Sequence, residues 1–278
     1  MLTQAEKGRR FRALHQRDHA FIIPNPWDIG SARLLQGLGF EALATTSAGF
    51  AFSIGKSDGG VDRETMLAHA SALAAAVDVP LSADLENGYE DDPARVAETV
   101  RLAAGVGLAG CSIEDVPQGR QQAPYGVELA AERVRAAAET AHGLPFQFTL
   151  TARAENYIVG RPNLRDTIAR LQAFQEAGAD VLFAPGLKTA EDITTVVRTV
   201  DRPLNVIMGL QGVQLTLAEL STMGVKRVSV GSALARAALG AFLRAAQELR
   251  EQGTFTFAEN AVKYADLNAM FAEKATSC

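Results

Sequence analysis

The sequence predicts an α/β protein of the (β/α)8 class, a TIM barrel built as a single domain over residues 1–278. Eight short, mostly apolar runs alternate with stretches rich in Ala, Leu, Glu and Arg. Continuous apolar runs are typical of strands buried on both faces of a parallel sheet, and apolar residues three or four positions apart are typical of helices. No linker or change in composition separates the units. This uninterrupted alternation favours a barrel over a doubly wound sheet, which usually has fewer strands and an obvious nucleotide loop.

Each predicted strand is a short run that ends in polar or small residues. The strands are Phe21–Asn25, Ala42–Ser47, Leu81–Glu86, Gly110–Asp115, Phe148–Glu155, Val181–Gly186, Leu204–Gly209 and Arg227–Ser232. The main predicted helices are Asp62–Val77, Asp92–Gly105, Gly126–Ala141, Asn163–Ala177, Thr189–Val200, Thr216–Met223 and Ala233–Glu251. Several helices close on a glycine such as Gly178 or Gly224, which accepts the left-handed conformation that ends a helix.

Two segments lie outside the barrel proper, which we assign to residues 21–250. Phe11 and Leu14 fall on one side of a short helix within residues 1–18. A surplus helix is predicted at Phe257–Ala272. It must pack against another surface, and a neighbouring subunit is one option.

The composition narrows the classes of partner. The net charge is −5, from 27 basic and 32 acidic residues, and no basic stripe interleaved with aromatics occurs, so nucleic-acid binding is not expected. No apolar run approaches the roughly 20 residues of a membrane helix, and the charged N-terminus does not resemble a secretory signal. Two cysteines, Cys111 and Cys278, support neither a disulfide framework nor a thiolate metal site. A cytoplasmic location and a small-molecule partner are predicted.

Acids at the end of the third strand indicate a functional site. Asp84 and Glu86 follow an apolar run, and strand alternation would direct both side chains to the same side, with their alpha carbons about 6.5 Å apart. Two carboxylates at this spacing suit a divalent cation that keeps its waters, as Mg²⁺ does. Solvated loop acids are the alternative. In barrels the chemistry lies at the carboxyl ends of the strands, where this sequence also gathers polar residues.

Several motifs together resemble the isocitrate lyase/phosphoenolpyruvate mutase superfamily. They occur in family order from about residue 21 to 232. The motifs are Asn25-Pro-Trp-Asp28, Thr45-Thr-Ser-Ala-Gly49, Gly55-Lys-Ser-Asp58, Asp84-Leu-Glu86-Asn-Gly88, Ser112-Ile-Glu114-Asp115 and Thr151-Ala-Arg153. The resemblance implies a magnesium-dependent barrel, with Mn²⁺ as a substitute, that binds a 2-oxo acid or its enolate. Such an enzyme makes or breaks a carbon–carbon or phosphorus–carbon bond.

The resemblance also assigns roles to particular residues. The implied metal site consists of Asp84 as the direct ligand, with Glu86 and Glu114 acting through water. The implied catalytic residues are Asp58 on a mobile segment, Arg153 and Glu114. The implied substrate contacts are Ser47, the amides of Ala48 and Gly49, Arg153 and Asn205. A metal and an arginine suit the chemistry, because cleavage beside a ketone leaves negative charge on an enolate oxygen.

Departures from the family pattern narrow the set of activities that the sequence predicts. The lyase loop that carries a catalytic cysteine reads Val116–Gly126 here and contains none, and residues 183–187 lack the lyase glutamate. These changes argue against a standard isocitrate or methylisocitrate lyase. The mutase asparagine has no clear counterpart, although Gln118, Arg120, Gln121 and Gln122 offer polar groups. The candidates that remain are the mutase-like members of the superfamily, which include oxaloacetate decarboxylases or hydrolases and lyases of other 2-substituted malates.

Other interpretations remain open at this level. Lys188 would form a Schiff base in an aldolase, Val228–Gly231 would hold a phosphate, and a barrel without catalysis would simply bind a 2-oxo acid. Cys111 is expected in the core, and Asp115 is expected to cap a turn rather than to act catalytically. The histidines, at positions 15, 19, 69 and 142, show no metal-ligand spacing and are expected at the surface or in packing. The resemblance implies a homodimer or homotetramer with a swapped eighth helix.

Overall fold

The computed structural model describes residues 2–118 and 123–272 and forms a barrel of eight parallel strands. The strands are β1 (Phe21–Ile23), β2 (Leu43–Ala44), β3 (Leu81–Asp84), β4 (Gly110–Glu114), β5 (Thr149–Arg153), β6 (Val181–Phe183), β7 (Leu204–Ile207) and β8 (Arg227–Ser229). The sheet runs in the order β1-β8-β7-β6-β5-β4-β3-β2. The Ala44 amide donates to the Pro24 carbonyl at 3.1 Å, which brings the two edges together. The predicted (β/α)8 fold is confirmed.

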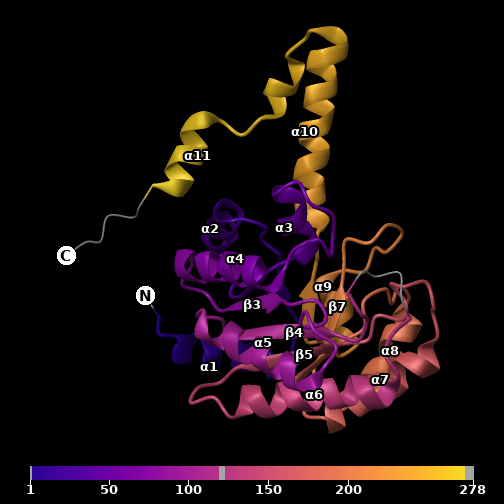
Figure 1. Cartoon of the computed structure of the whole chain (residues 1–278). Helices are drawn as coiled ribbons and strands as arrows, with labels where there is room; N and C mark the ends of the chain where they lie inside the picture. Colours follow the sequence, from indigo (N-terminus) through magenta and orange to yellow (C-terminus); the bar gives the residue numbers. More distant parts are fainter. Residues whose placement is uncertain (1, 119–122, 273–278) are drawn as a thin grey trace.

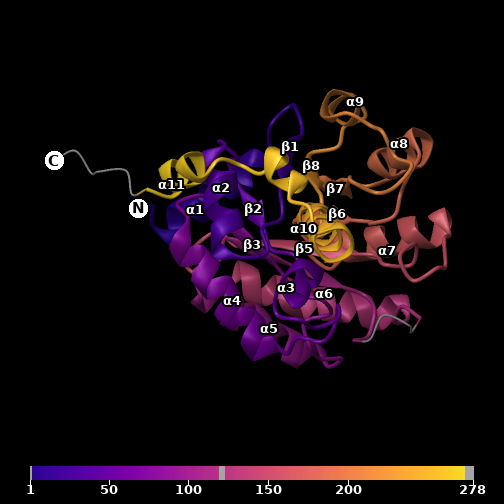
Figure 2. The same ribbon diagram turned by 90° about the horizontal axis from the view of Figure 1, so that it is seen from above.

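Helices surround the strands (Figure 2). They are α1 (Gln4–Leu14), α2 (Ile29–Gly37), α3 (Ser47–Ser53), α4 (Arg63–Ala76), α5 (Pro93–Gly105), α6 (Val127–His142), α7 (Leu164–Glu176), α8 (Ala190–Thr199), α9 (Leu217–Thr222), α10 (Ala233–Gln252) and α11 (Tyr264–Phe271), with a short 3-10 helix η1 (Thr256–Asn260). Most begin at a side-chain cap, as where Asp62 accepts from the Thr65 amide at the start of α4. The short helix α3 has no counterpart among the predicted helices.

Helix α1 lies against the amino-terminal part of the barrel, as its apolar side predicts. Phe11 and Leu14 are buried in a cluster with Phe21 and Ile23 of β1. A Cβ at Gly8 would lie 2.1 Å from the Gln147 carbonyl oxygen, so only glycine allows α1 to approach this closely.

The C-terminal helices extend beyond the barrel. Helix α10 projects outward, and α11 returns to lie beside α2 (Figure 1). The prediction of one helix over 257–272 is wrong in detail, because η1 and α11 are separate elements. The Glu248 carboxylate of α10 accepts hydrogen bonds from the amides of Thr256 and Phe257. These bonds hold the chain in a tight turn, so a regular helix begins only at Tyr264.

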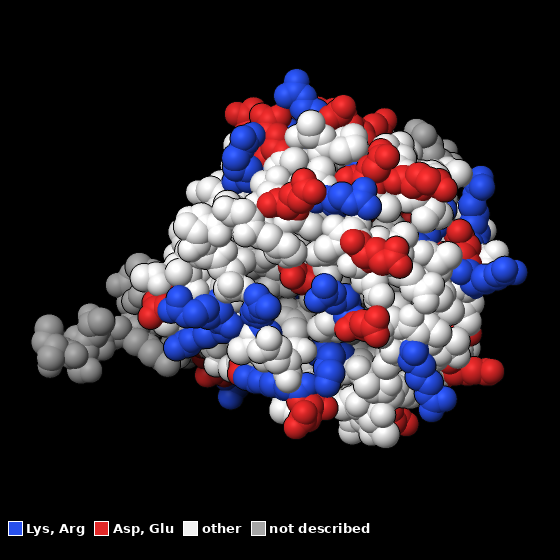
Figure 3. Space-filling model, turned by 90° about the horizontal axis from the view of Figure 1, so that it is seen from below, with Lys and Arg blue, Asp and Glu red and all other residues white. Residues whose placement is uncertain are grey.

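Surface properties add two observations. Within residues 2–118 and 123–272, no helix is both long and apolar enough to cross a membrane. On the face seen in Figure 3, acidic and basic side chains are interspersed.

Candidate functional site

Asp84 occupies the carboxyl end of β3, and both of its oxygens are engaged. The Arg153 guanidinium donates to Oδ1 at 2.7 Å, and the Ser47 hydroxyl donates to Oδ2 at 2.9 Å. The Asp84 amide donates to the Thr45 hydroxyl at 2.9 Å. The ends of β2, β3 and β5 therefore meet through side-chain contacts, and the predicted residues Ser47, Asp84 and Arg153 lie together.

Arg153, at the end of β5, faces three carboxylates. Its nitrogens lie 2.7 Å from Asp84, 3.1 Å from Glu114 and 2.9 Å from Glu155. Burial disfavours the guanidinium charge, but Glu155, Asp84 and Glu114 outweigh that cost and raise the pKa of Arg153 above its ordinary value. One buried guanidinium thus contacts three acidic side chains.

Glu86 follows β3 rather than extending it. Its φ is 49°, a left-handed conformation that is uncommon for a residue other than glycine. Its carbonyl accepts the Glu114 amide at 2.8 Å, and its own amide lies 3.4 Å from Asp84 Oδ1. Because β3 ends at Asp84, this turn sets the relation between the two acids, and the alternation argument does not apply.

The segment after β3 is held by a buried arginine from α6. The Arg133 guanidinium donates to the carbonyls of Asn87, Glu90 and Asp91, and it stacks over the Tyr125 ring with a centroid distance of 4.2 Å. Backbone carbonyls in the interior must be paired, and Arg133 pairs three from one turn. The site acids therefore stand on a fixed loop.

The predicted carboxylate-gripping turn forms the start of α3. Ser47 is its first residue, and Thr46 is the N-cap, because the Gly49 amide donates to the Thr46 hydroxyl at 3.2 Å. The Ser47 amide lies 3.3 Å from Asp84 Oδ2. In this arrangement the turn contacts the predicted metal ligand, and Ala48 follows within the helix. Its substrate role stays a prediction.

Asn205 lies lower in the barrel interior and contacts a residue that the sequence reasoning missed. Its amide nitrogen donates to the Ser229 hydroxyl at 3.1 Å, and its Oδ1 accepts from Arg227 at 2.9 Å. Asn205, Arg227, Asp84 and Arg153 line one cavity of about 70 Å³. The sequence feature that could have identified Arg227 is a charged residue at the start of an apolar strand.

Two more predicted elements lie in loops. Asp58 is half-buried between α3 and α4. In the segment 116–126, Gln118 is exposed, and the polar residues Arg120, Gln121 and Gln122 lie outside the described residues. The roles of Asp58 and of this loop stay predictions.

Tyr89 is a second residue that the sequence reasoning missed. It has a φ of 66°, and its buried hydroxyl has no hydrogen-bond partner among the described residues. Burial first, and then the charges of Glu86 and Asp84, raise the pKa of this hydroxyl, which stays protonated. No motif marked it, because tyrosine after a glycine is common in loops.

Cys111 lies in the core, as predicted, whereas the Asp115 side chain joins neighbouring elements and, among the described residues, does not cap the turn after β4. Asp115 accepts from the Glu155 amide at 2.8 Å and from Arg170 at 2.9 Å, linking β4 to β5 and α7. Cys111 is fully buried in β4, and burial raises the pKa of its thiol. Neither side chain lines the cavity at Asp84.

The rival sites receive no support from the geometry. Lys188 is exposed and lines a surface hollow with Tyr157 and Asp192, apart from the lining of the Asp84 cavity. The amides of Val230 and Gly231 both donate to Asn25 Oδ1 at 2.9 Å, so a side chain occupies the donors of the proposed phosphate site.

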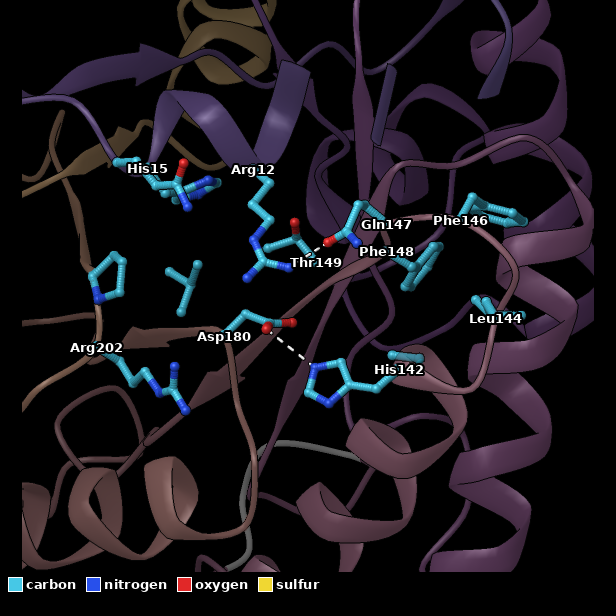
Figure 4. Close-up of a pocket in the computed structure, with 14 residues that line it drawn as sticks. Arg12, His15, His142, Leu144, Phe146, Gln147, Phe148, Thr149, Asp180 and Arg202 are labelled. Carbon is cyan, nitrogen blue, oxygen red and sulfur yellow. Dashed lines mark hydrogen bonds and ion pairs between the residues drawn. The ribbon is translucent and has the colours of Figure 1, made fainter. Parts of the chain in front are cut away.

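A larger hollow of about 520 Å³ lies near α1, away from the carboxyl ends of the strands (Figure 4). Arg12, His15 and Arg202 contribute to its lining, and His142 pairs with Asp180 at 3.1 Å within it. Chemistry in barrels occurs at the opposite ends of the strands, so we assign the candidate site to the Asp84 cavity.

The residues at the strand ends fit a hydrated divalent cation. In the described part of the chain, no three His, Cys, Asp or Glu side chains already form a closed metal-binding cluster. Mg²⁺ does not need one, because it commonly binds through one or two carboxylates and keeps its waters. The donors are hard carboxylate oxygens, which converge around Arg153.

The fold and the strand-end site define a barrel enzyme of the lyase and mutase type. The pattern of the family described as "Phosphoenolpyruvate phosphomutase" matches residues 11–250. The chain belongs to this family, within the isocitrate lyase/phosphoenolpyruvate mutase superfamily, and the predicted superfamily is confirmed.

Similar proteins include solved structures and a protein named for its activity. The crystal structure of a Burkholderia cenocepacia protein assigned to the lyases or mutases is 59% identical, with a TM-score of 0.95, and the match covers 98% of this chain and 97% of that one. An oxaloacetate decarboxylase of Paraburkholderia xenovorans is 31% identical over 92% of this chain and 86% of its own. The structure of an oxaloacetate acetylhydrolase with its product oxalate is 26% identical, with a TM-score of 0.85 and coverage of 96% and 94%.

Proposed function

We propose that the chain is a magnesium-dependent carbon–carbon lyase, decarboxylase or hydrolase that acts on a small 2-oxo acid or related carboxylate through an enolate-like intermediate. The main support for this proposal is that Asp84, Glu114 and Glu155 all contact the guanidinium of Arg153. These carboxylates converge at the carboxyl ends of neighbouring strands, and carboxylate oxygens are the ligands that Mg²⁺ takes, usually from one or two side chains with water completing its shell. A divalent cation bound here would share these carboxylates with Arg153.

The chain's own residues would divide the chemical work. A bound Mg²⁺ would supply Lewis-acid stabilisation to the enolate oxygen. Asp84 would hold it directly, and Glu86 and Glu114 through water. Arg153 would donate hydrogen bonds to the oxo acid, once its contact with Asp84 is shared with the cation. Because these groups are buried and held by neighbouring strands, they stabilise developing charge with little reorganisation.

The relatives support this class of substrate. Two similar proteins act on oxaloacetate according to their names, and one of them was crystallised with oxalate. The absence of the lyase cysteine from residues 116–126 agrees with a chemistry other than standard isocitrate cleavage. Phosphorus–carbon bond chemistry is the less favoured alternative.

A substrate panel with a matched pair of variants tests the proposal. Purified protein with Mg²⁺ would be given oxaloacetate, 2-substituted malates and phosphonopyruvate, with release of pyruvate, oxalate and glyoxylate followed. Activity in the wild type should fall by about 100-fold or more in Asp84→Asn. Asp166→Asn, which alters a partly exposed acid on α7, should keep it. Unchanged activity in Asp84→Asn would disprove the metal assignment.

A barrel that binds 2-oxo acids without turnover is the second candidate. The observation that favours it is the loss of both the lyase cysteine and the glutamate expected in residues 183–187. Tight binding of oxaloacetate in calorimetry, with no product from the whole panel, would select this alternative.

We further propose a homodimer or homotetramer built on the C-terminal helices. Among the described residues of α10, only Ala235 is buried, while Phe242 and Leu243 are 66% and 56% exposed. Apolar surface of this kind usually marks an interface. Light scattering should give at least a dimer, and Phe242→Ser should weaken it. A monomeric wild type would contradict this. The predicted cytoplasmic location is kept as part of the proposal.

A further inference from the structure

A second buried arginine lines the candidate cavity, one layer below Arg153. Arg227, at the start of β8, is 5% exposed. Its guanidinium donates to the Thr151 hydroxyl at 3.0 Å, and Thr151 precedes Arg153 by two positions on β5. Side chains two positions apart on a strand are about 6.5 Å apart on the same face. Arg227 therefore reaches β5 two positions before Arg153, and both arginines line the same cavity.

The surroundings of Arg227 are neutral. Besides Thr151, its nitrogens meet Asn205 Oδ1 at 2.9 Å and His15 Nε2 at 3.4 Å. His15 Nδ1 lies 2.8 Å from the Phe11 carbonyl and must donate to it, so Nε2 is the acceptor of a neutral imidazole. Among the described residues, no carboxylate lies within ion-pair distance of Arg227. Burial, with the charge of Arg153, lowers the pKa of Arg227 to about 9, which leaves it charged at neutral pH.

A buried charge is retained at a cost unless an anion compensates it. Arg153 contacts three carboxylates, whereas Arg227 contacts none in residues 2–118 and 123–272 and shares a cavity with Arg153. An anionic group that enters the cavity between the two arginines would relieve their mutual repulsion and gain hydrogen bonds. The volume of about 70 Å³ suits a carboxylate on a short chain rather than a ring or a long tail.

We propose that Arg227 is a specificity-determining residue that binds the second carboxylate of a short dicarboxylic ligand. The strand-end acids and Arg153 hold the end that reacts, and Arg227 holds the far end. Asn205 and Thr151 orient the guanidinium, and helix α1 supplies His15 beneath it. This inference rests on the proposed function for the identity of the site, and it narrows the substrate class to short dicarboxylates over monocarboxylic 2-oxo acids.

The test measures binding without turnover, so it is separate from the test of lyase activity. Calorimetry would give the affinities of malonate and succinate, with two carboxylates, and of propionate and butyrate, with one, at equal Mg²⁺. The wild type should prefer the dicarboxylates by about tenfold or more. Arg227→Met should abolish that preference and leave propionate binding nearly unchanged. Arg227→Lys should keep part of it, and Arg202→Met, at the hollow near α1, should keep all of it.

Three outcomes would overturn the inference. One is equal affinity of the wild type for the two ligand classes. Another is an equal loss of both classes in Arg227→Met, which would indicate a structural role alone. If Arg227→Met does not fold, Arg227→Gln decides the matter, because a preference identical to that of the wild type after loss of the charge shows that the guanidinium makes no contact. A protein without lyase activity that still prefers dicarboxylates through Arg227 supports the inference and rejects only the catalytic proposal.

Discussion

The two arginines of the barrel interior have the same chemistry and opposite surroundings. Arg153, at the carboxyl end of β5, contacts Asp84, Glu114 and Glu155, whereas Arg227, at the start of β8, contacts neutral groups. The upper layer of the cavity is therefore acidic, whereas the lower layer holds a cation among neutral groups. Such a gradient can place a cation at the strand ends and an anionic group below it, which gives the ligand a direction.

Replacement of Arg153 should have the largest effect. Arg153→Met would remove the guanidinium that contacts three carboxylates, and loss of one partner of a buried pair costs about 3–5 kcal/mol of unfolding free energy. Urea denaturation measures the loss. Arg227→Met is the matched control and should cost clearly less, since no carboxylate loses a partner. Equal losses in the two variants would contradict the electrostatic distinction.

Addition of Mg²⁺ should have the second largest effect, an increase in the free energy of unfolding. At about 100 times its dissociation constant, a ligand specific for the folded state adds about 2.7 kcal/mol. Thermal unfolding with and without EDTA measures this, and Asp84→Asn should remove most of the gain. A gain of the same size in Asp84→Asn would place the cation elsewhere.

His15, which contacts Arg227, should make the stability of the fold fall at acidic pH. Burial first, and then Arg227, lower the pKa of His15 to about 3 from 6.5. As the pH falls below 6.5, the unfolded chain gains a proton that the folded chain cannot accept, so stability falls until about pH 3. By pH 5 this loss is about 2 kcal/mol.

Urea denaturation of the wild type and His15→Gln at pH 7.5 and 5.0 isolates this contribution. The glutamine keeps an acceptor for Arg227 but does not titrate, so its stability should depend less on pH. Parallel pH dependence in the two proteins would show that the pKa of His15 is the same in the folded and unfolded chains.

Loss of the Thr151 hydroxyl, a neutral acceptor, should have the smallest effect on the free energy of unfolding. Thr151→Val removes the hydroxyl that accepts from Arg227 at 3.0 Å, at a cost of about 1 kcal/mol. Thr151→Ser keeps the hydroxyl and serves as the control in the same denaturation series. If Thr151→Val were as stable as the serine variant, Arg227 would have another partner for that nitrogen.

Much of the barrel could be predicted because its signals are local. Apolar runs, helix caps and glycine stops repeat with each β/α unit, and the strand ends carry the polar residues of the site. Asp84, Glu114 and Arg153 were found this way, and the structure brings them into contact. The left-handed turn at Glu86 was not found, since nothing in the residue type announces a φ of 49°.

The amino-acid sequence by itself determined the class of fold, the family and the acids and arginine at the strand ends, because each rests on a pattern along the chain. Only the tertiary structure decided what balances each charge. Arg227 and His15 are 212 positions apart, and they meet because α1 packs against the start of the barrel. The burial that leaves Arg227 without an acid is a property of eight strands closing around it, and no local pattern records it.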